Sequence, residues 1–118
     1  MARNRMIKPD FWADEKMSAV SRDARLAFIG LWTHSDDFGV VRGHALWLKN
    51  HIFPYDGVKI PTMQKWLDEL LEIGVIRKFE KNGEGYYYIP AFLTHQTIDK
   101  PSQKLRNPEA PEEIRCIP

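Results

Sequence analysis

The chain has 118 residues, of which 43% are hydrophobic, and this fits one ordinary domain with a single core. Four Trp, six Phe and four Tyr argue against global disorder. The formal net charge of +1 provides no overall attraction to nucleic acids or membranes, so any DNA-binding surface must come from local charge.

The cysteine content and the hydropathy pattern bear on location. The single cysteine, Cys116, cannot form an internal disulfide, so a reducing, cytoplasmic location is expected. The charged N-terminus is not followed by an apolar run, and a signal peptide is therefore not expected. No apolar stretch approaches the ~20 residues of a membrane-spanning helix, which predicts that the membrane is not a partner.

The N-terminal residues 1–8 are expected to form a basic arm without an acidic residue. The bases of this arm are Arg3, Arg5 and Lys8. After the arm, Asp10 is expected to cap a short helical turn at Phe11 and Trp12.

Two helices are predicted in the first half of the chain. Ser21 caps the first, which covers residues 22–35 and carries apolar residues on more than one face, as a buried helix does. A turn at residues 35–39 and a short apolar strand at residues 40–41 follow. The second helix covers residues 44–52 and stops before a Pro-Tyr-Asp-Gly break.

Residues 61–73 have the clearest helical pattern, with apolar residues on one face and polar residues on the other. Pro61 suits the first turn of this third helix, and Gly74 is placed to end it in the left-handed conformation. A strand with β-branched and aromatic residues is predicted at residues 75–81.

A β-hairpin is predicted around Asn82 and Gly83, because both residues tolerate the positive φ angles of a two-residue turn. Such a turn would place Lys78 opposite Tyr87. A bulge at Gly85 would instead shift this register by one residue, and the sequence leaves both registers open.

The order helix, short strand, helix, helix, hairpin predicts an α+β winged-helix domain over residues 1–95. Residues 96–118 are rich in proline and lack periodicity. We expect this segment to be a polar tail or linker that is ordered, if at all, by packing on the domain or on a partner.

The sequence contains no recognisable catalytic or metal-binding arrangement, so neither enzymatic activity nor a cofactor is expected. The four histidines are scattered, and no cysteine or carboxylate completes a metal-like spacing. His34 together with Asp36 and Asp37 gives a weak metal or acid–base alternative. Paired aspartates before Phe-Gly are, however, typical of a turn.

The third helix offers polar residues for DNA recognition. In a winged helix this helix enters the major groove with its N-terminal residues first. Here those residues are Thr62, Gln64 and Lys65. Glutamine can recognise adenine, and lysine can recognise guanine or a phosphate. The alternative is that all three are ordinary solvated helix residues.

The hairpin offers Arg77, Lys78 and Lys81 among the tyrosines at residues 86–88. This mixture suits phosphate contact and stacking in the wing of a winged helix. The alternative is an exposed hairpin whose lysines discourage aggregation through the sheet edge.

Asp68, Glu69 and Glu72 oppose insertion of the whole third helix into a groove, because carboxylates there would repel phosphates. Either only the first turn contacts DNA, or this surface binds a protein. Basic residues that could compensate for these carboxylates lie near the two ends of the chain. Flexible basic arms of this kind can enter the minor groove of DNA. They are Arg3, Arg5, Lys100 and Lys104. The alternative for both ends is a solvated terminus.

An ordered set of segments resembles a family of phage and prophage replication-initiation (replisome organiser) proteins, which is related to the N-terminal winged helix of the DnaD primosomal proteins. The segments span about residues 4–108 and are IKPDFWADEKMSAVSRDARLAFIGLW, DDFGVVRG, HIFPYDGV, LLEIGVIRKFE and YIPAFLTHQTIDKPSQ. The resemblance implies a winged-helix fold and a role in phage replication, through origin DNA or through host replication proteins. Longer members carry a further C-terminal module, so a stand-alone or truncated DNA-binding domain is expected here.

These observations predict a non-enzymatic protein that docks on double-stranded DNA through the hairpin and the basic arms. Partner replication proteins from the host or phage and a homo-oligomer are also compatible with the family. A protein-interaction module is the main alternative, since Trp12, Trp47 and Tyr55 exceed what one small core can bury. A transcriptional regulator would share the fold and the DNA prediction.

Overall fold

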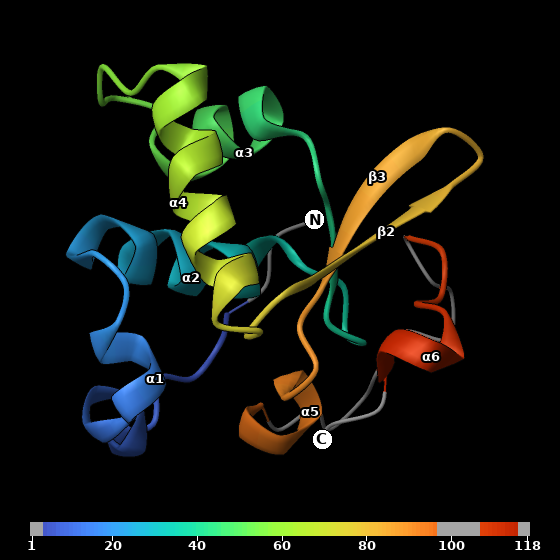
Figure 1. Ribbon diagram of the computed structural model, residues 1–118, viewed down its shortest axis with the longest axis horizontal. Helices are drawn as coiled ribbons and strands as arrows, with labels where there is room; N and C mark the ends of the chain where they lie inside the picture. Colours follow the sequence, from blue (N-terminus) through green and yellow to red (C-terminus); the bar gives the residue numbers. More distant parts are fainter. Residues whose placement is uncertain (1–3, 97–106, 116–118) are drawn as a thin grey trace.

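The computed structural model describes residues 4–96 and 107–115 as a small α+β unit (Figure 1). The elements follow the chain as η1 (Pro9–Ala13), α1 (Glu15–Ser18), α2 (Arg22–His34), β1 (Val40–Arg42), α3 (Ala45–Ile52), α4 (Ile60–Glu72), β2 (Arg77–Lys81), β3 (Glu84–Tyr88), α5 (Phe92–His95) and α6 (Glu112–Arg115). None of the helices in this described part of the chain is both long and apolar enough to span a membrane.

The N-terminal turn forms as expected, but its predicted cap is wrong. The 3-10 helix η1 has Pro9 in its first turn, so its cap position falls on Lys8, which is extended as residues before proline generally are. Asp10 therefore lies inside the first turn and caps nothing. The capping carboxylate is Asp14, which accepts a hydrogen bond from the backbone N–H of Lys16 at the start of α1.

Helix α2 begins where the sequence predicts. The Ser21 hydroxyl oxygen accepts a hydrogen bond of 3.2 Å from the backbone N–H of Ala24. The helix is largely buried, as its apolar residues predict, although Leu26 is 53% exposed. The buried face consists of Ala24, Ala27, Phe28, Leu31 and Trp32.

The third predicted helix, α4, is confirmed at both ends. Pro61 lies in its first turn, and Gly74 follows its end with φ of +79°. A side chain at Gly74 would be strained at this angle, which explains the glycine at this position. Met63, Leu67 and Leu70 are fully buried against the rest of the core.

The three strands form one antiparallel sheet in the order β1-β3-β2. The β2–β3 turn has positive φ at both Asn82 (54°) and Gly83 (80°), as a type I′ hairpin turn requires. Lys78 pairs with Tyr87, so the register of a two-residue turn is confirmed. Gly85 pairs with Glu80 within the regular ladder, which excludes a bulge at this glycine.

The two faces of the sheet are covered by different parts of the chain. Val41 and Tyr87 belong to the main core with α2, α3 and α4. Phe79 and Tyr86, on the opposite face, form a second cluster with Val40. This second cluster is closed by Ala110 and by Ile114 of α6. Figure 1 shows α6 beside the hairpin, on the side away from α2 and α4.

The described part of the predicted tail, residues 107–115, is thus packed on the sheet. The Asn107 amide nitrogen donates to the carbonyl oxygen of Val40 at 2.9 Å, and Ala110 is only 3% exposed. Gln96, at the predicted start of the tail, is buried and bonded to Met6. The middle of the predicted tail, including Lys100, Lys104 and Arg106, lies outside the described residues.

Candidate nucleic-acid interface

The first two turns of α4 carry the three polar residues that the sequence singled out. Thr62 and Lys65 are exposed, whereas Gln64 is half-buried. The Gln64 amide nitrogen donates to a carboxylate oxygen of Asp68 at 2.9 Å, one helical turn further on. The side chains of Thr62 and Lys65 are therefore open to solvent, whereas the Gln64 side chain already has a hydrogen-bond partner within the protein.

Met63 and Leu67 of α4 belong to the same buried cluster as Tyr87 of the hairpin. Burial raises the pKa of Tyr87, and the Gln64 side chain partly opposes this increase. Lys78 pairs with Tyr87 across the sheet, so both side chains lie on the face that packs against the helices. Lys78 therefore lies on the sheet face that is directed toward the helices, the face that also carries Tyr87.

The hairpin does not present all three of its predicted bases to solvent. Lys78 and Lys81 are exposed. Arg77 lies at the first position of β2, where its guanidinium donates a hydrogen bond of 2.8 Å to the carbonyl oxygen of Ile114. Arg77, which the sequence placed among the DNA-binding residues of the wing, is thus half-buried and bonded to the C-terminal segment.

The tyrosines at residues 86–88 were expected to offer stacking surfaces, and this expectation is also wrong for two of them. Tyr86 and Tyr87 are 9% and 2% exposed. The Tyr86 ring stacks on Phe79 at 5.4 Å, and its hydroxyl donates to Glu84 at 3.1 Å. Burial and the Glu84 carboxylate raise the pKa of Tyr86. Both rings are thus core residues, and Tyr88 is half-buried.

Arg5 is not part of a free basic arm. Its side chain is 3% exposed, and its guanidinium pairs with the carboxylate of Asp37 at 3.4 Å. The same guanidinium donates to the carbonyl oxygens of Trp32, Ser35 and Asp36. The prediction that Arg5 enters a minor groove is wrong, because the residue is an internal anchor. Lys8 of the same predicted arm is exposed, and its ammonium donates to the carbonyl oxygen of Thr94 at 3.4 Å. Arg3, Lys100 and Lys104 lie outside the described residues.

One of the three carboxylates that argued against DNA binding has a structural role. Glu69 accepts two hydrogen bonds from Ser21, at 2.9 Å from the backbone N–H and at 3.0 Å from the hydroxyl. It therefore lies at the positive N-terminal end of α2, where an anion is favoured. The sequence count of charges missed this pairing because the two residues lie on different helices. Asp68 and Glu72 remain exposed on α4.

Sequence reasoning missed the exposed base Arg42 at the end of β1. Its guanidinium lies 5.9 Å from the centre of the Trp47 ring on α3, within cation–π range. In the sheet register Arg42 pairs with Tyr86 of the hairpin. The sequence contains one signal for this residue, because successive side chains of a strand point to opposite faces of the sheet. Arg42 directly follows the apolar pair Val40–Val41, so a strand that continued through it would carry a basic side chain.

In the described part of the chain, His34, Asp36 and Asp37 do not form a group of potential metal ligands. The Asp36 carboxylate accepts hydrogen bonds from the backbone N–H groups of Phe38 and Val40, which confirms that the segment is a turn. His34 bonds to the carbonyl of Gly30 within its own helix. Among residues 4–96 and 107–115, no group of three potential metal ligands occurs.

Comparison with protein-family models, with curated proteins and with solved structures finds no significant match to this chain.

Proposed function

We propose that this protein is a winged-helix protein that binds double-stranded DNA and acts in phage DNA replication. In this proposal the first turns of α4 face the major groove and the β2–β3 hairpin is the wing. Thr62 and Lys65 lie nearest the bases, and Lys78 and Lys81 contact phosphates. The replication role rests on the resemblance of the sequence to phage replication-initiation proteins.

The observation that carries the proposal is the packing of Met63, in the first half of α4, with Tyr87 of the hairpin in one buried cluster. Lys78 pairs with Tyr87 across the sheet, so this lysine and the start of α4 belong to elements that share the core. A duplex presents one phosphate per strand every ~3.4 Å. Basic side chains on adjacent elements of the protein can therefore bind phosphates of the same DNA strand.

The distribution of carboxylates also supports docking by the start of α4. Glu69 is bonded to Ser21, and the exposed acids Asp68 and Glu72 lie in the second half of the helix. Only the N-terminal half of α4 is free of acidic residues. A helix that inserts with its N-terminus would keep the carboxylates furthest from the phosphates.

The experiment that tests the proposal is fluorescence anisotropy with a labelled duplex of mixed sequence over a salt series. Non-specific binding is expected with a Kd in the ~1–100 µM range near physiological salt, and with an affinity that falls steeply between ~50 and ~200 mM salt. Counterion release from the phosphates causes this fall. Binding that is absent at low salt, or that does not depend on salt, would contradict the proposal.

A second function, a protein-interaction module, is favoured by the exposure of large apolar side chains. Tyr55 is 99% exposed, Trp12 67% and Leu46 43%. Such residues commonly anchor protein interfaces. Light scattering of the pure protein discriminates between the two functions. A monomer that binds DNA favours the first function, and an oligomer that is indifferent to DNA favours the second.

A further inference from the structure

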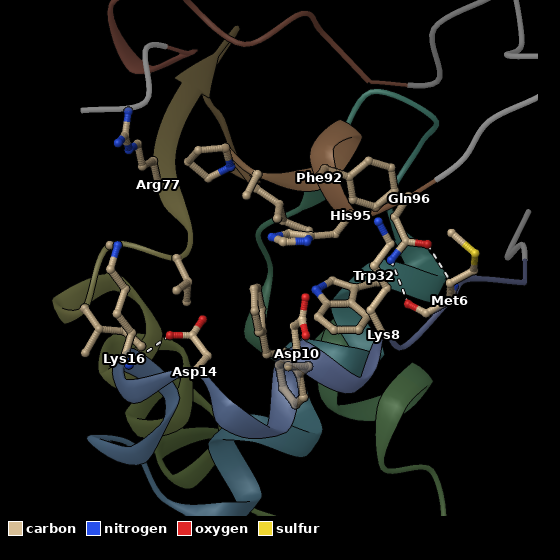
Figure 2. A pocket seen from close by; sticks show the side chains of 18 residues that line it. Met6, Lys8, Asp10, Asp14, Lys16, Trp32, Arg77, Phe92, His95 and Gln96 are labelled. Atoms are coloured by element: carbon tan, nitrogen blue, oxygen red, sulfur yellow. Dashed lines mark hydrogen bonds between the residues drawn. The ribbon is translucent and has the colours of Figure 1, made fainter.

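A cavity of about 550 Å³ lies at the end of α4 opposite its first turn, away from the proposed DNA surface. It is bounded by η1 and α1, by α2, by the α4–β2 junction and by the segment from Ile89 to Gln96 (Figure 2). Cavities of ~300–1,000 Å³ are typical of small-molecule sites.

Aromatic rings form much of the cavity wall. They are Phe11, Phe28, Trp32 and Phe92. The Phe11 ring meets Trp32 edge-on, with centroids 5.3 Å apart and an interplanar angle of 84°. Phe28 meets Trp32 in the same way at 5.2 Å. Phe11 is half-buried, and Phe28 and Trp32 are each 7% exposed, so part of this aromatic wall is open to a ligand and suits an aromatic group.

The wall is held in place by hydrogen bonds between distant segments. The backbone N–H of Met6 donates to the Gln96 side-chain oxygen at 2.8 Å, and the Gln96 amide nitrogen donates back to the Met6 carbonyl at 2.9 Å (Figure 2). This pair joins the N-terminal segment to the end of α5. The cavity is therefore preorganised by the fold, which lowers the entropic cost of binding.

The charged groups around the cavity favour an anion. Three bases line it, Lys8, Lys16 and Arg77, against two acids, Asp10 and Asp14. Asp14 already accepts the capping hydrogen bond of α1. Figure 2 shows Lys16 and Arg77 on the same side of the cavity. Within the described residues, the Lys16 ammonium has no hydrogen bond or ion pair.

We propose that this cavity binds a flat aromatic molecule that carries one acidic group, with the rings against Trp32 and Phe11 and the anion at Lys16. The aromatic part loses water on entering the apolar wall. The single net positive charge of the lining matches one carboxylate, sulfonate or phosphate monoester. This site is separate from the proposed DNA surface and does not depend on it.

The test uses two fluorescent probes, 1-anilinonaphthalene-8-sulfonate and its uncharged counterpart N-phenyl-1-naphthylamine, titrated into the folded full chain. The sulfonate probe is expected to bind once per chain and more tightly than the neutral probe. Lys16→Met is expected to weaken the sulfonate probe by ~3- to 10-fold and to leave the neutral probe unchanged, because only the ion pair is lost. Lys59→Met, at the other end of α4, is the control and should change neither.

Filling the cavity gives the second arm of the test. Ala91→Phe places a ring in the cavity and is expected to reduce the affinity of both probes at least ~10-fold. Ala91→Leu, a smaller change, serves if circular dichroism shows that Ala91→Phe is unfolded. The proposal is overturned if the filling variant binds the sulfonate probe as the parent does. It is equally overturned if Lys16→Met affects both probes alike or neither.

Discussion

Arg5 and Asp37 form an ion pair of 3.4 Å in which the side chains are only 3% and 2% exposed. Arg5 reaches this site from the N-terminal segment, 32 residues away in sequence. Its guanidinium also lies 4.9 Å from the centre of the Phe92 ring in α5. One charged residue therefore joins the N-terminus, the α2–β1 turn and α5.

The variant Arg5→Met should destabilise the protein by ~3–5 kcal/mol, because it leaves the buried Asp37 charge and several carbonyl groups without this donor. Urea denaturation monitored by tryptophan fluorescence measures the change. Arg22→Met, at an exposed position on α2, is the matched control and should stay within ~0.5 kcal/mol of the parent. Equal stabilities for the two variants would show that Arg5 is a solvated arm residue after all.

Asp36 should make the folded state more stable as the pH falls. Burial raises the pKa of this carboxyl above its usual value of 3.8, and the hydrogen bonds from Val40 and Phe38 only partly compensate. The folded protein therefore binds this proton at a higher pH than the unfolded chain does. Between the two pKa values the folded state holds more protons at this site, so its stability decreases as the pH rises.

The variant Asp36→Asn lacks this titration but keeps an oxygen that accepts from Phe38 and Val40. Its stability relative to the parent should increase as the pH rises above the usual carboxyl pKa of 3.8, because only the parent loses stability as Asp36 ionises. Urea denaturation of both proteins across the range measures the difference. A difference that does not vary with pH, or that changes in the opposite direction, would refute the assignment.

Ser21 and Glu69 should be energetically coupled. Ser21→Ala removes the cap of α2 and should cost ~1 kcal/mol. Glu69→Gln removes the charge at the helix N-terminus. A double-mutant cycle should give a coupling energy of at least ~0.5 kcal/mol, as expected for residues in contact. Glu72→Gln, on the exposed surface of the same helix, is the control. Strict additivity of Ser21→Ala and Glu69→Gln would mean that the hydrogen bond from the Ser21 hydroxyl to Glu69 contributes nothing.

Ala110 should be intolerant of a charge. It is 3% exposed and closes the cluster of Val40, Phe79 and Tyr86. Ala110→Glu either buries an unpaired carboxylate or displaces residues 107–115, and should cost ~1–3 kcal/mol in thermal or urea unfolding. Glu113→Ala, at an exposed position of α6, should be nearly neutral. If both variants match the parent, the C-terminal segment does not contribute to stability.

Locally determined features were predictable from the sequence. The Asn82-Gly83 turn, the Gly74 helix end and the Ser21 cap each depend on the conformational preferences of one or two residues and their neighbours. The structure confirms all three. The hairpin register was only narrowed to two possibilities by the sequence, and the structure has the one that a two-residue loop produces without a bulge at Gly85.

The partners of charged side chains were not predictable. In the sequence, nothing distinguishes Arg5 and Arg77 from basic residues that are free in solvent. Their partners lie 32 and 37 residues away along the chain. Whether such a side chain meets solvent depends on the tertiary packing of the N- and C-terminal segments, which have no periodic pattern. Among the described residues, the predicted DNA-binding set that remains is Thr62, Gln64, Lys65, Lys78 and Lys81.

The salt dependence of DNA binding by the double variant Lys78→Ala, Lys81→Ala tests the central proposal most directly. The control double variant Lys16→Ala, Arg22→Ala removes the same charge from α1 and α2. If the hairpin contacts phosphates, the slope of log K against log salt should decrease in magnitude by ~2 for the hairpin variant, about 0.9 for each lost contact. The control should keep the slope of the parent. Equal slopes for the two double variants would contradict DNA binding through the hairpin.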